Sequence, residues 1–355
     1  MDITNIIRPE IKAMKAYPVP SSEGYIKLDA MENPYTYSDE LIAELSKALA
    51  QAPLNRYPDP NGHGLKDDLR EAFDIPQNAH IILGNGSDEL ITIIMQAIAK
   101  PDAVVLSVEP SFVMYKINAL FSKVRYVGVP LNEDFSLNLE NTLAAIKKEQ
   151  PSVVFIAYPN NPTGPRFERE DVLKIIEAAP GLVVVDEAYQ AFASDSFMDL
   201  AGSLPNLVVL RTLSKVGFAG IRVGYGAGCP EIISELDKVR PPYNMNQLSI
   251  TVAKFALHYK QSFEEQAKKI MDERERMRTA LKAYDQITLF ASEANFLTVR
   301  VPNAPALFEA LKNNMILVKL LHGVHPLLDH CLRFTVGKPE ENQAVLDVIS
   351  QFFES

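Results

Sequence analysis

The sequence has few cysteines and no long apolar segment, and these absences narrow the classes of protein that it can encode. Two cysteines, Cys229 and Cys331, occur in 355 residues, too few for the disulfide framework of a small secreted protein. The apolar runs are all far shorter than the ~20 residues that a membrane-spanning helix needs. The N-terminus, MDITNIIRPEIKAM, also lacks the charged-then-apolar plan of a secretion signal. We therefore expect a cytoplasmic protein that does not enter a membrane.

Long basic runs are absent too, and the formal net charge is −10. A protein of this charge is not expected to have nucleic acid or an anionic membrane surface as its main partner. Three histidines, His322, His325 and His330, lie close together in the segment LHGVHPLLDH. Pro326 interrupts helical spacing there, and no cysteine or paired carboxylate completes a metal site. We expect these histidines to lie in a loop or to face a substrate, and we expect no metal.

From about residue 80 the sequence alternates between short apolar runs and amphipathic segments, which predicts a mostly parallel α/β sheet. Several runs are apolar throughout, as in sheets that helices cover on both faces. The seven predicted strands span residues 80–83, 103–108, 124–129, 152–157, 182–186, 207–212 and 222–227.

After about residue 245 the pattern changes to that of a smaller α+β domain. A long charged helix is predicted over 261–284 and a shorter one near 304–313, with a closing helix at the C-terminus. Strands are predicted over 295–301, 316–321 and 331–336. At this length we expect two domains, a large one over 51–245 and a small one over 246–355, with residues 1–50 packing against the small domain.

Polar residues follow several of the predicted strands. Lys215 comes directly after the strand 207–212, Asp186 ends the run LVVVD, and Asn161 lies in the turn YPNNPTG. In parallel α/β sheets ligands bind beyond the carboxyl ends of the strands, so these side chains are candidates for one site. Each also has a plain interpretation: a solvated lysine, a capping or ion-paired aspartate, and a tight turn.

The segment LGNGSDEL, residues 83–90, ends a strand and begins a helix. A helix start of this kind binds phosphate through its free N–H groups and its dipole. The glycine spacing is not that of a dinucleotide-binding loop, and Asp88 and Glu89 would repel phosphate unless they point away.

Together these residues match the requirements of a pyridoxal phosphate site. A lysine amine forms a Schiff base with the aldehyde, and an aspartate keeps the pyridine nitrogen protonated so that the ring can accept electrons. Arg222 offers a planar fork to the phosphate. The other candidate contacts are Ser87, Asn161, Tyr189, Thr212 and Ser214.

The order and spacing of seven segments resemble those of the fold-type I pyridoxal-phosphate aminotransferases, and most closely the histidinol-phosphate aminotransferases. These segments are KLDAMENPY, NRYPDPNGHGLKDDL, GNGSDEL, YPNNPTG, VDEAY, RTLSKVGFAGIRVGY and CLRFTVGKPEEN. The resemblance implies that Lys215 binds the cofactor and carries the proton at the substrate, while Asp186 pairs with the ring nitrogen. Asn161 and Tyr189 would contact the ring hydroxyl and Phe112 would stack on the ring.

The resemblance also assigns the phosphate and the substrate. Backbone amides of Ser87 and Asp88, with Ser214 and Arg222, would hold the cofactor phosphate. Tyr57 would reach it from the neighbouring subunit of a homodimer. The substrate-side residues would be Tyr17, Asn33, Lys319 and Arg333.

Two of the substrate-side positions bear on specificity. Arg333 resembles the arginine that grips the carboxylate of glutamate or 2-oxoglutarate. Lys319 stands where many relatives carry an arginine for the substrate phosphate, although it would also fit a strand residue that alternates outward into solvent. Met31 replaces the asparagine that relatives usually have.

The resemblance implies transamination between histidinol phosphate and 2-oxoglutarate in histidine biosynthesis. An aromatic amino-acid aminotransferase on the same scaffold is an alternative, as is a decarboxylase of a phosphorylated amino acid. A non-catalytic regulator that keeps the fold is a further alternative, but it would have no need of Lys215 and Asp186.

Overall fold

The seven predicted strands form one sheet in the computed structural model, which describes residues 3–16 and 19–354. In spatial order the strands are β2 (His80–Asn85), β8 (Val223–Gly228), β7 (Leu207–Thr212), β6 (Leu182–Asp186), β5 (Val153–Ala157), β3 (Val104–Glu109) and β4 (Arg125–Pro130). β8 runs antiparallel to β2 and β7, and the pairs from β7 to β4 are parallel. The prediction of a mostly parallel seven-stranded sheet is confirmed.

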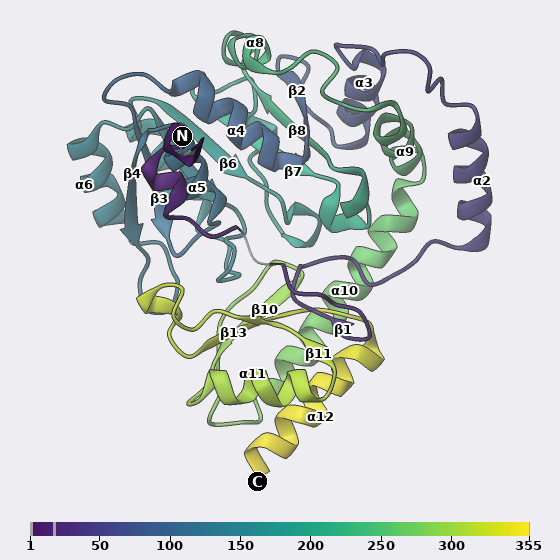
Figure 1. Ribbon diagram of the computed structural model, residues 1–355, viewed down its shortest axis with the longest axis vertical. Coiled ribbons are helices and arrows are strands. Elements are labelled where there is room, and N and C mark those ends of the chain that lie inside the picture. Colours follow the sequence, from purple (N-terminus) through teal and green to yellow (C-terminus); the bar gives the residue numbers. More distant parts are fainter. Residues whose placement is uncertain (1–2, 17–18, 355) are drawn as a thin grey trace.

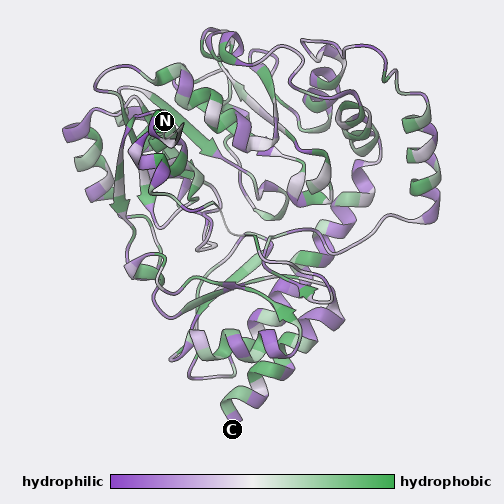
Figure 2. Ribbon diagram, viewed as in Figure 1, coloured by the Kyte–Doolittle hydropathy of each residue, from purple (hydrophilic) through white to green (hydrophobic). Residues whose placement is uncertain are grey.

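Helices cover both faces of this sheet, which explains why its central strands are apolar throughout (Figures 1 and 2). Successive residues of β6 point to opposite faces: Val183 and Val185 join one buried cluster and Val184 joins another. The first cluster includes side chains of α3 (His63–Ala72), α6 (Leu139–Glu149), α7 (Arg169–Ala178) and α9 (Gln247–His258). The second includes side chains of α4 (Gly86–Ile98), α5 (Met114–Phe121) and α8 (Pro230–Val239).

A smaller α+β unit lies beyond the carboxyl ends of the parallel strands (Figure 1). Its four-stranded antiparallel sheet has the order β12 (Lys319–Leu320), β13 (Cys331–Thr335), β10 (Phe296–Arg300) and β9 (Thr288–Leu289). Three helices pack with it: α10 (Lys260–Leu281), α11 (Ala304–Asn313) and α12 (Pro339–Glu354). The predicted α+β character is thus present, and α10 connects this unit to the larger one.

The single strand predicted over 316–321 is wrong. The structure has two short strands there: β11 (Ile316–Leu317) pairs in parallel with β1 (Ile26–Lys27), and β12 pairs with β13. Val318 between them is buried like Ile316 and Leu317 before it, so the apolar run carries no signal of the change of partner. The split depends on a pairing with the distant N-terminal segment, which local sequence does not reveal.

The N-terminal residues contact both units. In the segment before residue 17, which includes η1 (Ile3–Ile6) and α1 (Pro9–Lys12), the Arg8 side chain donates to the carbonyl of Phe121 at 3.0 Å. α2 (Asp39–Ala50) packs against α9, whereas β1 pairs within the smaller unit. The domain bounds at residues 50 and 245 stay a prediction. Within the described residues, no helix has the length and apolar character needed to cross a bilayer.

Candidate active site

The carboxyl ends of β2, β5, β6 and β7 meet at one edge of the sheet and surround a cavity. Ten residues singled out from the sequence line it, although they come from segments more than a hundred residues apart. They are Ser87, Asp88, Phe112, Asn161, Asp186, Tyr189, Thr212, Ser214, Lys215 and Arg222. The carboxyl ends of the strands thus bring the predicted side chains together at one cavity, as expected for a parallel α/β sheet.

Lys215 lies on the short 3₁₀ helix η4 (Ser214–Val216) that follows β7. Its ammonium donates to the carbonyl of Ala30 at 3.3 Å and lies 5.6 Å from the centre of the Tyr189 ring. Burial, with a smaller contribution from the Arg333 charge, lowers the pKa of Lys215 to about 8. The turn is closed by Gly217 at φ 116°, a conformation that other residues rarely adopt. The amine is thus held where it can lose its proton near neutral pH.

Asp186 ends β6 and is 3% exposed. The hydroxyl of Tyr115 donates to its Oδ2 at 2.8 Å, and the amide of Ala188 donates to its Oδ1 at 3.2 Å. Burial raises the pKa of Asp186 to about 6, against the effect of these two hydrogen bonds. A carboxylate buried to this extent is stabilised by a cation on the side that faces the cavity.

Tyr115 is a residue that the sequence reasoning missed. It is fully buried at the start of α5, where its ring stacks on Phe155 at 4.6 Å and meets the edge of Phe112 at 5.6 Å. Its spacing of three residues from Phe112 at a helix start was a signal that both rings share one face. We identify Tyr115 as the residue that positions the Asp186 carboxylate.

Asn161 joins the large sheet to the small one. Its amide nitrogen donates to the hydroxyl of Tyr189 at 3.0 Å, and its amide oxygen accepts from Nη1 of Arg333 at 2.6 Å. Nη2 of Arg333 donates to the carbonyl of Asp29 at 2.8 Å. The plain interpretation of Asn161 as a turn residue is therefore incomplete, because its side chain connects two candidate site residues.

Arg222 lies beside the start of α4, where the sequence predicted a phosphate site. Its Nη1 donates to Ser214 Oγ at 3.1 Å and its Nη2 donates to Asp88 Oδ2 at 3.1 Å. Gly86 begins the helix at φ 75°, and a Cβ there would lie 2.6 Å from Arg222 Nη2. The positive φ and the close approach of the guanidinium both favour glycine at this position.

Glu89 does not oppose an anion at this helix start. Its carboxylate accepts from the Asn85 amide at 2.7 Å and from Asn244 Nδ2 at 2.7 Å. Asp88 faces Arg222 and forms an ion pair with it. Glu89 thus points away from the predicted phosphate site, as the phosphate hypothesis required. The charge of Asp88 is neutralised by Arg222.

A second cavity of about 320 Å³ continues from the first and shares Met31, Phe112 and Asn161 with it. Its walls on the small-sheet side include Lys319, Arg333 and His325. Lys319 and Arg333 are cross-strand partners of β12 and β13, and burial, with the Arg333 charge second, lowers the pKa of Lys319. Lys319 therefore lines a cavity, and the alternative of a side chain directed into bulk solvent is not supported.

The histidines near Lys319 form backbone hydrogen bonds. Nδ1 of His325 accepts from the amide of Leu327 at 3.1 Å, and Nδ1 of His322 accepts from the amide of His330 at 3.0 Å. Among residues 3–16 and 19–354, no three histidine, cysteine or acidic side chains are arranged to hold a metal ion.

Met31 lies at a position where the resemblance led us to expect an asparagine. It has φ 53°, a left-handed conformation that is uncommon for methionine. Thr335 Oγ1 accepts from its amide at 2.9 Å and Asn295 Nδ2 donates to its carbonyl at 3.0 Å. Two contacts from the small unit thus fix the residue that lies between the two cavities.

Two predicted residues within the described part of the chain do not line these cavities. Tyr57 is 80% exposed and stacks on Tyr243, with ring centres 4.5 Å apart. Asn33 instead donates to Gln266 Oε1 at 2.8 Å and to the carbonyl of Val216 at 3.3 Å, so it fastens the N-terminal segment to α10 and η4. Tyr17 lies outside the described residues.

Comparison with known proteins agrees with this geometry. The family model "Aminotransferase class I and II" matches residues 23–349. The chain belongs to this aminotransferase family. A histidinol-phosphate aminotransferase of Chromobacterium violaceum is 61% identical over 353 residues, which cover 99% of each chain. One from Neisseria meningitidis is 54% identical over 355 residues, covering 99% of this chain and 97% of its own.

Solved aminotransferase structures share the architecture. The histidinol-phosphate aminotransferase of Sinorhizobium meliloti, in complex with pyridoxal-5'-phosphate, has a TM-score of 0.85 and 25% identity over 97% of both chains. The enzyme of Clostridium acetobutylicum also has a TM-score of 0.85, at 24% identity, over 92% of this chain and 99% of its own. The expected fold-type I architecture is thereby confirmed for this aminotransferase.

The raised pKa of Asp186 predicts a pH-dependent stability of the cofactor-free protein. The folded state holds the proton more tightly than the unfolded chain, because the pKa rises from 3.8 to about 6 on burial. This group therefore makes the free energy of unfolding decrease as the pH rises through that interval, by roughly 2–3 kcal/mol in all. Urea denaturation of the wild type and of Asp186→Asn, at several pH values across the interval, measures the difference in slope.

The exposed Asp272 on α10 provides the control. Asp272→Asn should keep the wild-type slope, since its carboxylate is 67% exposed. Equal slopes for the wild type and Asp186→Asn would contradict the assignment.

Proposed function

We propose that this protein transfers the amino group of histidinol phosphate to 2-oxoglutarate, giving imidazole-acetol phosphate and glutamate, in histidine biosynthesis. The observation that carries the proposal is the lysine and aspartate cavity that continues into a second cavity containing two cations, Arg333 and Lys319. Relatives with 61% and 54% identity over nearly the whole chain bear the corresponding name. We expect the enzyme to act in the cytoplasm.

The residues of the first cavity fit pyridoxal phosphate. The close approach of Arg222 to Gly86 and Ser214 makes an anion cradle, and the buried Asp186 carboxylate suits a protonated ring nitrogen. When bound, the cofactor supplies an aldehyde for the amino group and a ring that accepts electrons. Asn161 and Tyr189, already hydrogen-bonded to each other, would orient the ring through its hydroxyl, and Phe112 would cover one face.

Lys215 is the residue that we assign to proton transfer at the substrate Cα. Its lowered pKa, about 8, lets the amine take up or release a proton at little cost near neutral pH. The Tyr189 ring beside Nζ and the Ala30 carbonyl restrict where this amine can move. The proton can therefore be delivered to one face of the reacting carbon.

Arg333 and Lys319 would bind the acidic groups of the two substrates. Histidinol phosphate has a phosphate and no carboxylate, whereas glutamate has two carboxylates and no phosphate. Arg333 offers a fork suited to a carboxylate, and Lys319 supplies a compact charge for a phosphate dianion. Their cross-strand pairing keeps both cations on one wall of the second cavity, so either kind of anion is bound near the same reacting centre.

A homodimer would complete the site. Tyr57 and Tyr243 form an exposed stacked pair, and Leu54 and Leu248 are exposed apolar residues of the same segments of the chain. Large apolar side chains on a protein surface often mark an interface. We propose that Tyr57 crosses this interface and reaches the cofactor phosphate of the partner.

The remaining alternatives are not favoured. Relatives at 61% and 54% identity are named for histidinol phosphate rather than for an aromatic amino acid. An L-threonine-O-3-phosphate decarboxylase of Porphyromonas gingivalis has a TM-score of 0.77 at 23% identity, a likeness that concerns the fold alone. A non-catalytic regulator would not need the Lys215 and Asp186 pair.

Half-reaction spectra test the proposed activity. The enzyme loaded with pyridoxal phosphate should convert fully to its amino form with histidinol phosphate and with glutamate, and much more slowly with phenylalanine. Absorbance of the bound cofactor measures each conversion, and 2-oxoglutarate should reverse it. Fast conversion by phenylalanine with none by histidinol phosphate would support the aromatic aminotransferase instead.

Substitution of Lys319 tests phosphate recognition. Lys319→Ala removes a charge-assisted contact of about 1.5–3 kcal/mol, so kcat/KM for histidinol phosphate should fall roughly ten- to a hundred-fold. The half-reaction with phenylalanine should change little, because phenylalanine carries no phosphate. Lys312→Ala, on the neighbouring α11 and outside the cavity lining, is the control. An equal loss of reactivity with histidinol phosphate and with phenylalanine would show that Lys319 does not bind the substrate phosphate.

Mixed dimers test the role of Tyr57. Lys215→Ala has no amine for the reaction, and Tyr57→Phe has weakened phosphate binding, so each homodimer should have low activity. A mixed dimer contains one site with both groups intact if Tyr57 crosses the interface, and its activity should exceed that of either parent. Absence of recovery after confirmed subunit exchange would place the tyrosine within its own chain's site or outside catalysis.

A further inference from the structure

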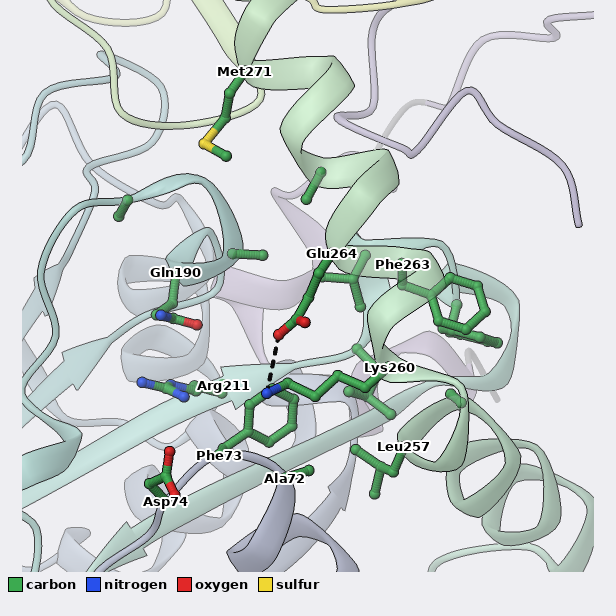
Figure 3. A pocket seen from close by; sticks show the side chains of 17 residues that line it. Ala72, Phe73, Asp74, Gln190, Arg211, Leu257, Lys260, Phe263, Glu264 and Met271 are labelled. Carbon is green, nitrogen blue, oxygen red and sulfur yellow. Dashed lines mark ion pairs between the residues drawn. The ribbon is translucent and has the colours of Figure 1, made fainter.

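Figure 3 shows a separate cavity of about 380 Å³. Its lining includes Gln190 and Val216, which follow Tyr189 and Lys215 in the chain. It is enclosed by α10, α9, the end of α3 and the 3₁₀ helices η2 (Gln190–Phe192) and η4. None of its lining residues belongs to the two cavities of the candidate active site. Its volume falls in the range of small-molecule sites, and at the lower end of it.

One layer of chain separates this cavity from the active site. From the end of β7 onward the side chains divide between the two cavities: Thr212, Ser214 and Lys215 line the cofactor cavity. Arg211, Leu213 and Val216 face the cavity behind it. Tyr189 and Gln190 divide between the two cavities in the same way. An occupant of the cavity behind η4 would therefore touch the residues next to Lys215 and Tyr189.

Charged side chains of both signs border this cavity behind η4, which we call the rear cavity. Figure 3 shows Gln190, Arg211 and Asp74 on one side and Lys260 and Glu264 on the other. Lys260 and Glu264 form an ion pair of 3.0 Å. Within the described part of the chain, the side-chain amide of Gln190 makes no hydrogen bond.

Arg211 is the one deeply buried charge of this lining, at 7% exposed. Its Nε donates to Glu187 Oε2 at 2.9 Å and its Nη2 donates to Ser196 Oγ at 2.7 Å. Two cations lie near the Phe73 ring: Arg211 Cζ is 5.7 Å and Lys260 Nζ is 5.5 Å from its centre. The proposed transamination uses none of these groups.

We propose that the rear cavity binds a free α-amino acid with an apolar or aromatic side chain. Its carboxylate would meet Arg211 and the unpartnered amide of Gln190, and its ammonium would meet Glu264. The side chain would lie among Phe73, Leu213 and Phe218. Arg211 is already paired with Glu187, and Lys260 with Glu264, so the charges around the cavity are balanced. A ligand with one charge of each sign keeps that balance, whereas a ligand with a single charge adds one that nothing compensates. The proposal is independent of the identity of the transamination substrate.

Binding to the reduced holoenzyme tests the proposal. Borohydride reduction fixes the cofactor to the enzyme, so that an added amino acid cannot react at the active site. Titration calorimetry with L-phenylalanine, L-leucine and L-histidine should then show that at least one of them binds with one site per chain. The analogues 3-phenylpropionate and phenethylamine, which have one charge each, should bind at least about tenfold more weakly than phenylalanine.

Two ion pairs on α10 give a matched pair of variants. Lys260→Met/Glu264→Leu removes the pair at the cavity and should weaken binding at least about tenfold. Lys268→Met/Asp272→Leu removes an exposed pair of the same spacing, 2.8 Å long, and should leave binding unchanged. Both double variants keep the net charge of the protein. If the cavity variant does not fold, Gln190→Leu replaces it with the same expectation.

Three results would overturn the proposal. The first is that none of the three amino acids binds at millimolar concentration. The second is binding that survives the cavity variant and is lost in Arg333→Ala, which would place the ligand in the active site. The third is equal affinity for phenylalanine and its singly charged analogues.

Discussion

The buried carboxylate of Asp186 is the constraint around which the candidate active site is arranged. The central strands are apolar on both sides because helices cover both faces of the sheet, so a charge at the end of β6 is almost wholly removed from bulk solvent. Such a group needs hydrogen bonds and an opposite charge. Tyr115 and the Ala188 amide supply the hydrogen bonds, and the open side of the carboxylate faces the cavity that contains Lys215. A protonated ring nitrogen bound in this cavity would supply the opposite charge.

The second requirement is that two sheets meet at this cavity. Arg333 reaches from the small sheet to the amide of Asn161, and that amide in turn holds Tyr189. The N-terminal segment takes part through Asp29 and Ala30, whose carbonyls accept from Arg333 and Lys215. Movement of the small sheet would therefore change the surroundings of the reacting amine directly. Under the proposed function, this coupling would link substrate binding by the small unit to the reaction at Lys215 on the large one.

Much of this arrangement could be predicted from the sequence, because the signals were local. Apolar runs located the strands, and the rule that parallel strands present their carboxyl ends together placed Lys215, Asp186 and Asn161 side by side. The features that were missed depend on distant partners. The break at Val318 arises from pairing with residues 26–27, and Tyr115 matters because its hydroxyl donates to Asp186, 71 residues further along the chain. The cavity behind η4 likewise follows from the path of α10, which no motif records. Tyr57 belongs to a different category, since its proposed role involves a second chain.

The central claim is that Lys215 is the amine that reacts with pyridoxal phosphate, and covalent trapping tests it most directly. The purified protein is incubated with pyridoxal phosphate, reduced with borohydride, digested and mapped by mass spectrometry. The account predicts one phosphopyridoxyl group per chain, located on Lys215, with labelling that increases as the pH rises through about 8, where burial has placed the pKa of this amine. A label that resides mainly on another lysine, or that persists at the same stoichiometry in Lys215→Ala, would contradict it.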